Sequence, residues 1–139
     1  MISTARTEWE GDLFSGSGTT TLASGVGTFA VNWKARADGA ASTTTPEELL
    51  AAAHASCYSM QLSNTLAGAG TPPTSLTTGA RVTFKPGEGI TAIELAVVGS
   101  VTGIDQEAFA AAAADAKVNC PVSGALRAVP ISLVEATLI

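Results

Sequence analysis

Residues 43–60 read TTTPEELLAAAHASCYSM, and this stretch decides how the chain folds. Thr45 and Glu48 have the spacing of a capping box, and Pro46 occupies the first helical position between them. The pattern therefore predicts a helix that begins at Pro46. It continues to about Ala67, where two glycines follow and end it.

The apolar residues of this helix surround it instead of forming one stripe. They are Leu49, Leu50, Ala53, Tyr58, Met60, Leu62 and Leu66. A helix that is apolar on every side has to be enclosed on every side. One short chain with about six strands can hardly enclose it, so we expect a homodimer in which a second copy adds its own sheet and helix.

Two groups of strands flank the helix. Residues 7–37 hold β-favouring runs around Trp9, at 19–22 and at 28–36, separated by glycines, which predicts a three-stranded meander. A polar loop is expected at 37–45. Beyond the helix, alternation over 76–84 and 93–97 around the PGEG turn predicts a hairpin, Asp105 caps a second helix, and 128–139 form a last strand. This order predicts an α+β fold in a single domain, residues 1–139.

Composition limits the classes of partner. The chain is 46% hydrophobic and only 14% charged, which again favours oligomerisation. Its net charge of −5 disfavours nucleic acid and anionic membranes, because both bind through cationic side chains. No apolar run reaches the length of a signal peptide core or a membrane span. We therefore expect a cytoplasmic protein whose two cysteines are reduced or cycle between states.

Those cysteines, Cys57 and Cys120, are far apart in the sequence, so only the fold can bring them together. Cys57 is expected to be buried in the apolar helix. Cys120 is expected at a corner, because Pro121 ends or redirects the helix that carries Lys117. A buried cysteine is usually inert packing, and reactivity requires that something stabilise its thiolate.

A cation for such a thiolate has to come from elsewhere, because Cys57 lies on the order of 15 Å along the helix from Glu47, beyond the reach of the helix dipole. Arg36 is the first candidate, since it ends the predicted third strand. Lys34 shares its face by strand alternation and is the second. Glu48 is used by the capping box, which leaves Glu47 free to hold a guanidinium through a bidentate carboxylate. Otherwise both glutamates merely complement the helix dipole.

His54 lies three residues before Cys57 and therefore on the same helical face. A zinc site would take His54, Cys57 and Cys120 as ligands, but a fourth donor and a paired short spacing are missing. No metal is expected. A lone histidine among alanines is more often a hydrogen-bonded core residue.

The segments TPEELLAAAHASCYSM, NCPVSGAL and WEGDL together resemble the OsmC/Ohr family of thiol-dependent hydroperoxide reductases, over essentially the whole chain. His54 and the CPVS sequence are similar to the OsmC branch. The resemblance implies an intertwined homodimer in which antiparallel sheets wrap around two central helices. It also implies that Cys57 is the peroxidatic thiol and Cys120 the resolving thiol. Arg36 and Glu47 would then be the partners of the thiolate.

The implied chemistry needs no metal, haem or flavin, because sulfur itself carries the two electrons. A Cys57 thiolate attacks the peroxide, and the sulfenic acid that forms condenses with Cys120 to a disulfide. An external dithiol, of lipoyl type according to the resemblance, restores the thiols. Apolar surroundings favour organic hydroperoxides over hydrogen peroxide, since each buried methylene contributes roughly 0.8 kcal/mol.

Two other classes of function stay open from the sequence. One is a non-catalytic thiol switch or small-molecule binding module, which is oxidised once per chain, whereas an enzyme consumes excess peroxide when a dithiol is supplied. The other is a dimeric scaffold with structural cysteines, which predicts thiols that do not react in the native state.

Overall fold

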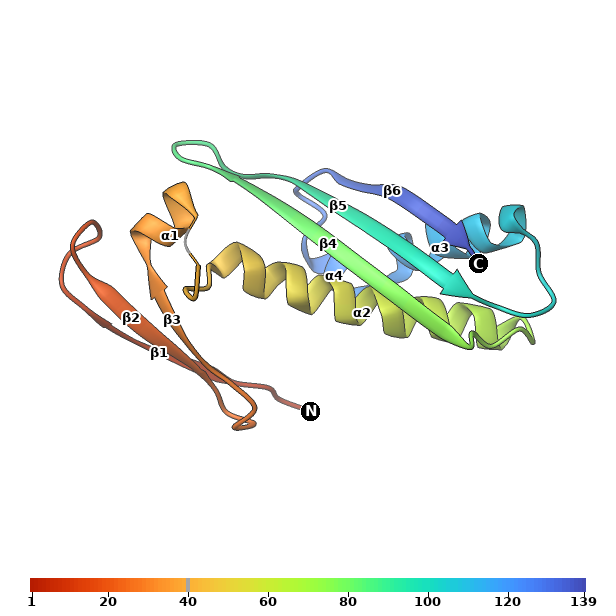
Figure 1. Cartoon of the computed structure of the whole chain (residues 1–139), viewed down its shortest axis with the longest axis horizontal. Coiled ribbons are helices and arrows are strands. Elements are labelled where there is room, and N and C mark those ends of the chain that lie inside the picture. The colour runs from red at the N-terminus through yellow and green to blue at the C-terminus, as the bar shows by residue number, and fades with distance from the viewer. Residues whose placement is uncertain (40) are drawn as a thin grey trace.

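The computed structural model describes residues 1–39 and 41–139. Ala40, inside the loop expected at 37–45, lies outside the described residues. The elements follow one another in a mixed order of strands and helices, which confirms the expected α+β class (Figure 1). They are β1 (Ala5–Glu10), β2 (Ser17–Leu22), β3 (Thr28–Asn32), α1 (Trp33–Asp38), α2 (Pro46–Gly68), β4 (Ser75–Lys85), β5 (Gly89–Ser100), α3 (Gln106–Asn119), α4 (Pro121–Ala125) and β6 (Ile131–Leu138).

The N-terminal sheet is the expected antiparallel meander β1-β2-β3. It stands beside the N-terminal end of α2, apart from the second sheet (Figure 1), and every residue of β1 is exposed. Aromatic edge contacts connect the two halves of the molecule: the Trp33 ring lies 6.1 Å from Phe14 and 6.1 Å from Phe84 of β4, between centroids. Trp33 thus connects the loop between β1 and β2 with β4 of the second sheet.

The third strand ends at Asn32, and the prediction that it runs to Arg36 was wrong. The Asn32 side chain accepts a 2.7 Å hydrogen bond from the backbone N–H of Ala35 and starts the short helix α1. This local cap starts a helix at residue 33, although the β-favouring run was expected to continue to residue 36. In a helix, side chains two positions apart point in directions that differ by about 200°, so Lys34 and Arg36 do not share a face.

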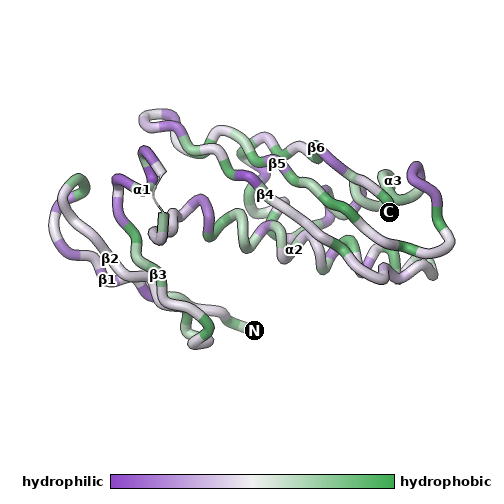
Figure 2. The backbone as a smooth tube through the Cα atoms, viewed as in Figure 1, coloured by the Kyte–Doolittle hydropathy of each residue, from purple (hydrophilic) through white to green (hydrophobic). Residues whose placement is uncertain are grey.

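The second sheet has the order β4-β5-β6, with α2 and α3 against it and α4 against these two helices (Figure 1). β4 and β5 form the expected hairpin. β6 joins parallel to β5 after the crossover through α3 and α4, so this sheet is mixed. The core between sheet and helices is apolar (Figure 2) and includes Tyr58, Leu62, Leu66, Leu95, Val97, Val101, Phe109, Ala113 and Ala116.

Helix α2 begins at Pro46 as predicted, and the Thr45 hydroxyl accepts a 3.0 Å hydrogen bond from the Glu48 N–H. The Glu48 carboxylate accepts from the Thr44 hydroxyl at 2.5 Å instead of reaching back to the backbone. Although α2 has 23 residues, neither it nor any other described helix has a long enough apolar stretch to cross a membrane.

One face of α2 is uncovered in this single chain. Tyr58, Leu62 and Leu66 on the opposite face are buried. The uncovered face carries Ala52, Ala53, Ser56 and Met60, and Met60 is 71% exposed. One chain therefore covers only part of a helix whose sequence is apolar all round.

Gly99 of β5 lies directly beneath the buried ring of Phe109. A Cβ added at Gly99 would meet Phe109 Cζ at 2.5 Å and Cε2 at 2.6 Å, and the ring has no exposed side toward which to move. We expect Gly99→Ala to lower the free energy of unfolding by about 1–3 kcal/mol. Gly79→Ala in β4, where a Cβ meets nothing within 4 Å, is the control. Urea denaturation of both variants compares them, and equal effects would contradict the packing argument.

Candidate active site

The fold brings the two cysteines into contact. The sulfur atoms of Cys57 and Cys120 lie 3.1 Å apart, and both are free thiols. Cys57 comes from α2, whereas Cys120 ends α3 and begins α4, with Pro121 at the first position of α4. The predicted corner at Cys120 is confirmed. A disulfide, with its S–S bond of about 2.0 Å, needs the sulfurs to approach by only about 1 Å more.

The two thiols are buried to different extents, and the burial of Cys57 is less than expected. Cys57 is only half-buried, so the prediction that it is buried was wrong, and Cys120 is 1% exposed. The physical reason is the helical position of Cys57, which lies between the buried Tyr58 and the exposed Ser56 on the flank of α2. A small molecule from solvent therefore meets the Cys57 sulfur first.

The surroundings act on the two thiols in opposite directions. Burial raises the pKa of Cys57, the Val122 N–H partly opposes this, and the contact with Cys120 raises the pKa further. Burial also acts to raise the pKa of Cys120, but hydrogen bonds from the Ser123 N–H, the Cys57 thiol and the Ser123 hydroxyl outweigh it. The net effect lowers the pKa of Cys120. In this single chain Cys120 therefore gives up its proton more readily than Cys57.

Arg36 and Glu47 form the ion pair expected from the sequence. Arg36 Nη2 lies 2.7 Å from Glu47 Oε1, and Arg36 Nε donates to Oε1 at 3.0 Å and to Oε2 at 3.2 Å. The guanidinium also lies over the Phe84 ring, 4.2 Å from its centroid. Glu47 is buried and Arg36 half-buried. Among the described residues Arg36 Nη1 has no hydrogen-bond partner, so this nitrogen is available as a donor.

The four predicted site residues thus form two pairs, not one cluster. Glu47 and Cys57 are ten residues apart on α2, a rise on the order of 15 Å. The contacts of Arg36 are with Glu47 and Phe84, and Lys34, the second candidate, is exposed on α1. We call the ion pair Arg36–Glu47 and the thiol pair Cys57–Cys120 the two half-sites of this chain.

His54 is a fully buried, hydrogen-bonded core residue, as its sequence context predicted. Its Nε2 atom lies 2.8 Å from the hydroxyl oxygen of Ser123. Burial lowers the pKa of His54, which keeps the ring neutral at neutral pH. Over the residues that the structure describes, no three His, Cys, Asp or Glu side chains are grouped as metal ligands. Sequence reasoning did not select Ser123, although its place three residues after Cys120, at the start of α4, was a usable signal.

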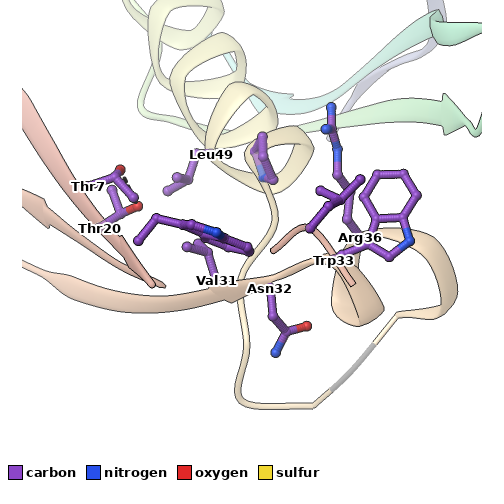
Figure 3. Close-up of a pocket in the computed structure, with 10 residues that line it drawn as sticks. Thr7, Thr20, Val31, Asn32, Trp33, Arg36 and Leu49 are labelled. Carbon is purple, nitrogen blue, oxygen red and sulfur yellow. Dashed lines mark hydrogen bonds between the residues drawn. The ribbon is translucent and has the colours of Figure 1, made fainter. Parts of the chain in front are cut away.

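A cavity of about 320 Å³ lies between the N-terminal sheet and the beginning of α2. Figure 3 shows Val31 and Leu49 facing each other across it, with Trp33 and Arg36 at one side. Its lining is mostly apolar, with Arg36 as its charged residue among the described ones. The cavity can hold an apolar group next to a guanidinium. No local sequence motif predicts this cavity, because the residues that line it come from segments far apart along the chain.

The sequence matches a known protein family and known curated proteins. The family described as OsmC-like protein matches residues 38–134. The curated protein Peroxiredoxin OsmC of Escherichia coli (strain K12) is 43% identical over 124 residues, which cover 86% of each chain. Peroxiredoxin OsmC of Shigella flexneri matches to the same extent.

Solved structures of low sequence identity share the fold. An organic hydroperoxide resistance protein OsmC from Legionella pneumophila superimposes with a TM-score of 0.72 at 20% identity and covers 99% of this chain and 98% of its own. The organic hydroperoxide resistance protein OhrB of Bacillus subtilis has a TM-score of 0.65 at 24% identity, and 98% of each chain is covered. The fold is thus that of the OsmC and Ohr proteins.

The unequal burial of the thiols predicts the order in which they react. We expect iodoacetamide to modify Cys57 of the native protein before Cys120, because access limits the buried thiol even though its pKa is lowered. The raised pKa of Cys57 means that its rate should keep increasing with pH above neutrality. Mass spectrometry of peptides from timed samples measures both sites, and the unfolded protein, in which both react, is the control. Earlier modification of Cys120 would contradict the arrangement.

Proposed function

Because this chain belongs to the OsmC family of thiol-dependent peroxidases, we propose that it reduces organic hydroperoxides to alcohols through Cys57 and Cys120. The observation that carries the proposal is the thiol pair, with sulfurs 3.1 Å apart, one accessible and one buried behind it. Such a pair suits an enzyme that is oxidised at the outer sulfur and closed by the inner one. The activity serves the response to oxidative stress.

Cys57 is the peroxidatic thiol in this proposal and Cys120 the resolving thiol. The Cys57 thiolate attacks the distal oxygen, the O–O bond breaks, and the alkoxide leaves as alcohol after taking a proton. Sulfur is oxidised by two electrons to the sulfenic acid. The Cys120 thiolate then attacks that sulfur, and hydroxide leaves as water with a second proton as the disulfide forms. Its lowered pKa suits Cys120 to this attack.

The cation that Cys57 needs comes, in this proposal, from a second copy of the chain. Two α2 helices that pack antiparallel about a point midway between Glu47 and Cys57 bring the ion pair of one copy level with the thiol pair of the other. The small residues Ala52, Ala53 and Ser56 on the uncovered face allow close approach. The free Nη1 of Arg36 would then face Cys57 and lower its pKa. Homodimerisation thus completes the site as well as covering α2.

An apolar substrate fits the surroundings of the ion pair. The cavity beside Arg36 is lined by Trp9, Leu13, Val31 and Leu49, and each methylene buried there adds roughly 0.8 kcal/mol to binding. Hydrogen peroxide has no alkyl group to bury, so it is reduced more slowly. No metal or cofactor takes part, because the thiols carry the electrons.

A dithiol of lipoyl type is the proposed reductant. The disulfide would lie with Cys120 behind Cys57 in a chain of net charge −5. Glutathione is bulky, anionic and has to react twice, whereas a slim dithiol enters once and closes its own ring. The need for continuous reduction is in keeping with a cytoplasmic location, and residues 1–139 act here as one domain.

Turnover tests the proposal. We expect the native protein to consume excess cumene hydroperoxide with dihydrolipoamide and much more slowly with glutathione at equal thiol concentration. Cys57→Ser should be inactive. Cys120→Ser should react once, stall as the sulfenic acid and then become over-oxidised. Peroxide consumption and mass spectrometry measure these outcomes. One oxidation per chain without turnover would favour the thiol switch instead.

Complementation tests the shared site. Cys57→Ser and Arg36→Gln chains should each form inactive dimers, but their co-expression should restore roughly a quarter of the activity, because half of randomly formed dimers carry one intact site of two. Co-expression of Cys57→Ser with Cys120→Ser is the control and should restore nothing, since both cysteines lie in one half-site. Circular dichroism and sedimentation verify folding and assembly. No restoration in the first mixture would contradict a site built from two copies.

A further inference from the structure

The mechanism proposed above leaves one buried polar contact unused. His54 of α2 and Ser123 of α4 lie 69 positions apart in the sequence, and their side chains meet at 2.8 Å between Nε2 and Oγ. His54 is fully buried and Ser123 is 6% exposed. Burying such groups is costly unless they are hydrogen-bonded, so this contact is a defined part of the fold. His54 lies three residues before Cys57, and Ser123 lies three residues after Cys120.

Ser123 connects this contact to the resolving thiol. Ser123 follows Cys120 by three residues, in the first turn of α4, where its hydroxyl and its backbone N–H both act to lower the pKa of Cys120. A serine hydroxyl has a single proton to donate, whereas its oxygen can accept from a second group. When that proton points to Cys120, the Ser123 oxygen is free to accept, and His54 must be the donor. The three residues then form a directed chain from His54 through Ser123 to Cys120.

The second ring nitrogen of His54 supports this direction. Within the described residues Nδ1 is buried and has no hydrogen-bond partner. In the Nε2–H tautomer, Nδ1 is an unpaired acceptor. In the other tautomer Nδ1 would be a buried N–H without an acceptor, and Nε2 would draw the Ser123 proton away from Cys120. The Nε2–H tautomer therefore satisfies more of the buried polar groups.

We propose that His54, acting through Ser123, holds Cys120 ready as the thiolate that closes the disulfide. The catalytic consequence rests on the proposed function. His54 and Ser123 are positioning residues, because neither touches peroxide. The step that they assist is the attack of Cys120 on the Cys57 sulfenic acid, which forms the S–S bond and releases water. A faster attack leaves less time for a second peroxide to convert the sulfenic acid into the irreversible sulfinic acid.

The groups around Cys120 explain why Ser123 becomes decisive after oxidation. Cys57 and Tyr58 of α2 are the titratable neighbours that interact with Cys120, and no charged side chain of the described residues is among them. Burial and the Cys120 charge raise the pKa of Tyr58 to about 12, so it stays neutral. Once Cys57 is oxidised, it no longer carries the thiol that contacts the Cys120 sulfur at 3.1 Å. Ser123 then remains as the side-chain donor, next to backbone N–H groups.

A titration tests the proposal without relying on turnover. In a Cys57→Ala background, which removes the thiol hydrogen bond, thiolate absorbance against pH follows Cys120 alone. We expect Ser123→Ala and His54→Leu to lower the thiolate fraction at neutral pH by about tenfold, because a hydrogen bond to a charged group is weakened or lost. Ser123→Thr and His54→Gln keep the donors and should remain near the parent. An unchanged titration in Ser123→Ala overturns the proposal.

The kinetics supply the second readout in chains that keep both cysteines. Ser123→Ala should leave the first reaction with peroxide unchanged, slow disulfide formation by about tenfold, and let Cys57 over-oxidise at lower peroxide concentration. A merely structural role of the pair would change the melting temperature of these variants without moving the titration of Cys120, which also overturns the proposal. If the native protein consumes no peroxide, the proposed function fails, but the titration still decides the His54–Ser123 chain.

Discussion

The incomplete cover of helix α2 is the constraint on which the rest of the structure depends. Its sequence is apolar on all sides, and the mixed sheet with α3 and α4 covers one of its faces. The same helix carries Glu47 in its first turn and Cys57 near its middle. Any surface that covers the remaining face therefore also comes to lie near these two candidate site residues. Helix α2 thus joins the uncovered face and both candidate half-sites in one element.

Different contacts hold Arg36 and Cys120 in place in the two half-sites. Arg36 is held by the Glu47 carboxylate and by the Phe84 ring, so its guanidinium plane is oriented before any substrate arrives. Cys120 is held by the corner between α3 and α4, where Pro121 starts a new helix and the Val122 and Ser123 amides point back at the sulfur. Preorganised charges of this kind stabilise an anion without moving when it forms. The spacing along α2 then sets the distance between the two.

Local signals explain what the sequence predicted well. The Thr45 cap, Pro46, the Asp105 cap and the alternation in β5 each act within a few residues, and the structure has all of them. The choice of Glu47 as partner of Arg36 also succeeded, although the Glu48 carboxylate accepts a hydrogen bond from Thr44 instead of completing the capping box. The strand over residues 33–36 failed because the Asn32 cap, itself local, was not recognised.

Long-range packing explains what the sequence did not predict. The half-burial of Cys57 depends on which neighbours cover the flank of α2, and nothing near Cys57 in the sequence encodes this. The contact of His54 with Ser123 and the cavity beside Arg36 likewise join segments that are far apart along the chain. Family motifs pointed to Cys57 and Cys120 as a pair, whereas the geometry between them required the fold.

The place of the two cysteines in the chain has a thermodynamic consequence. A bond between Cys57 and Cys120 would close a loop of 63 residues and tie α2 to α4. Such a cross-link removes conformational freedom from the unfolded chain and stabilises the native state by about 4 kcal/mol in the chain-entropy description. By linkage, the folded protein favours its oxidised form by the same amount relative to the unfolded chain. A reductant of such a bond would have to work against the fold as well as against the sulfur–sulfur bond.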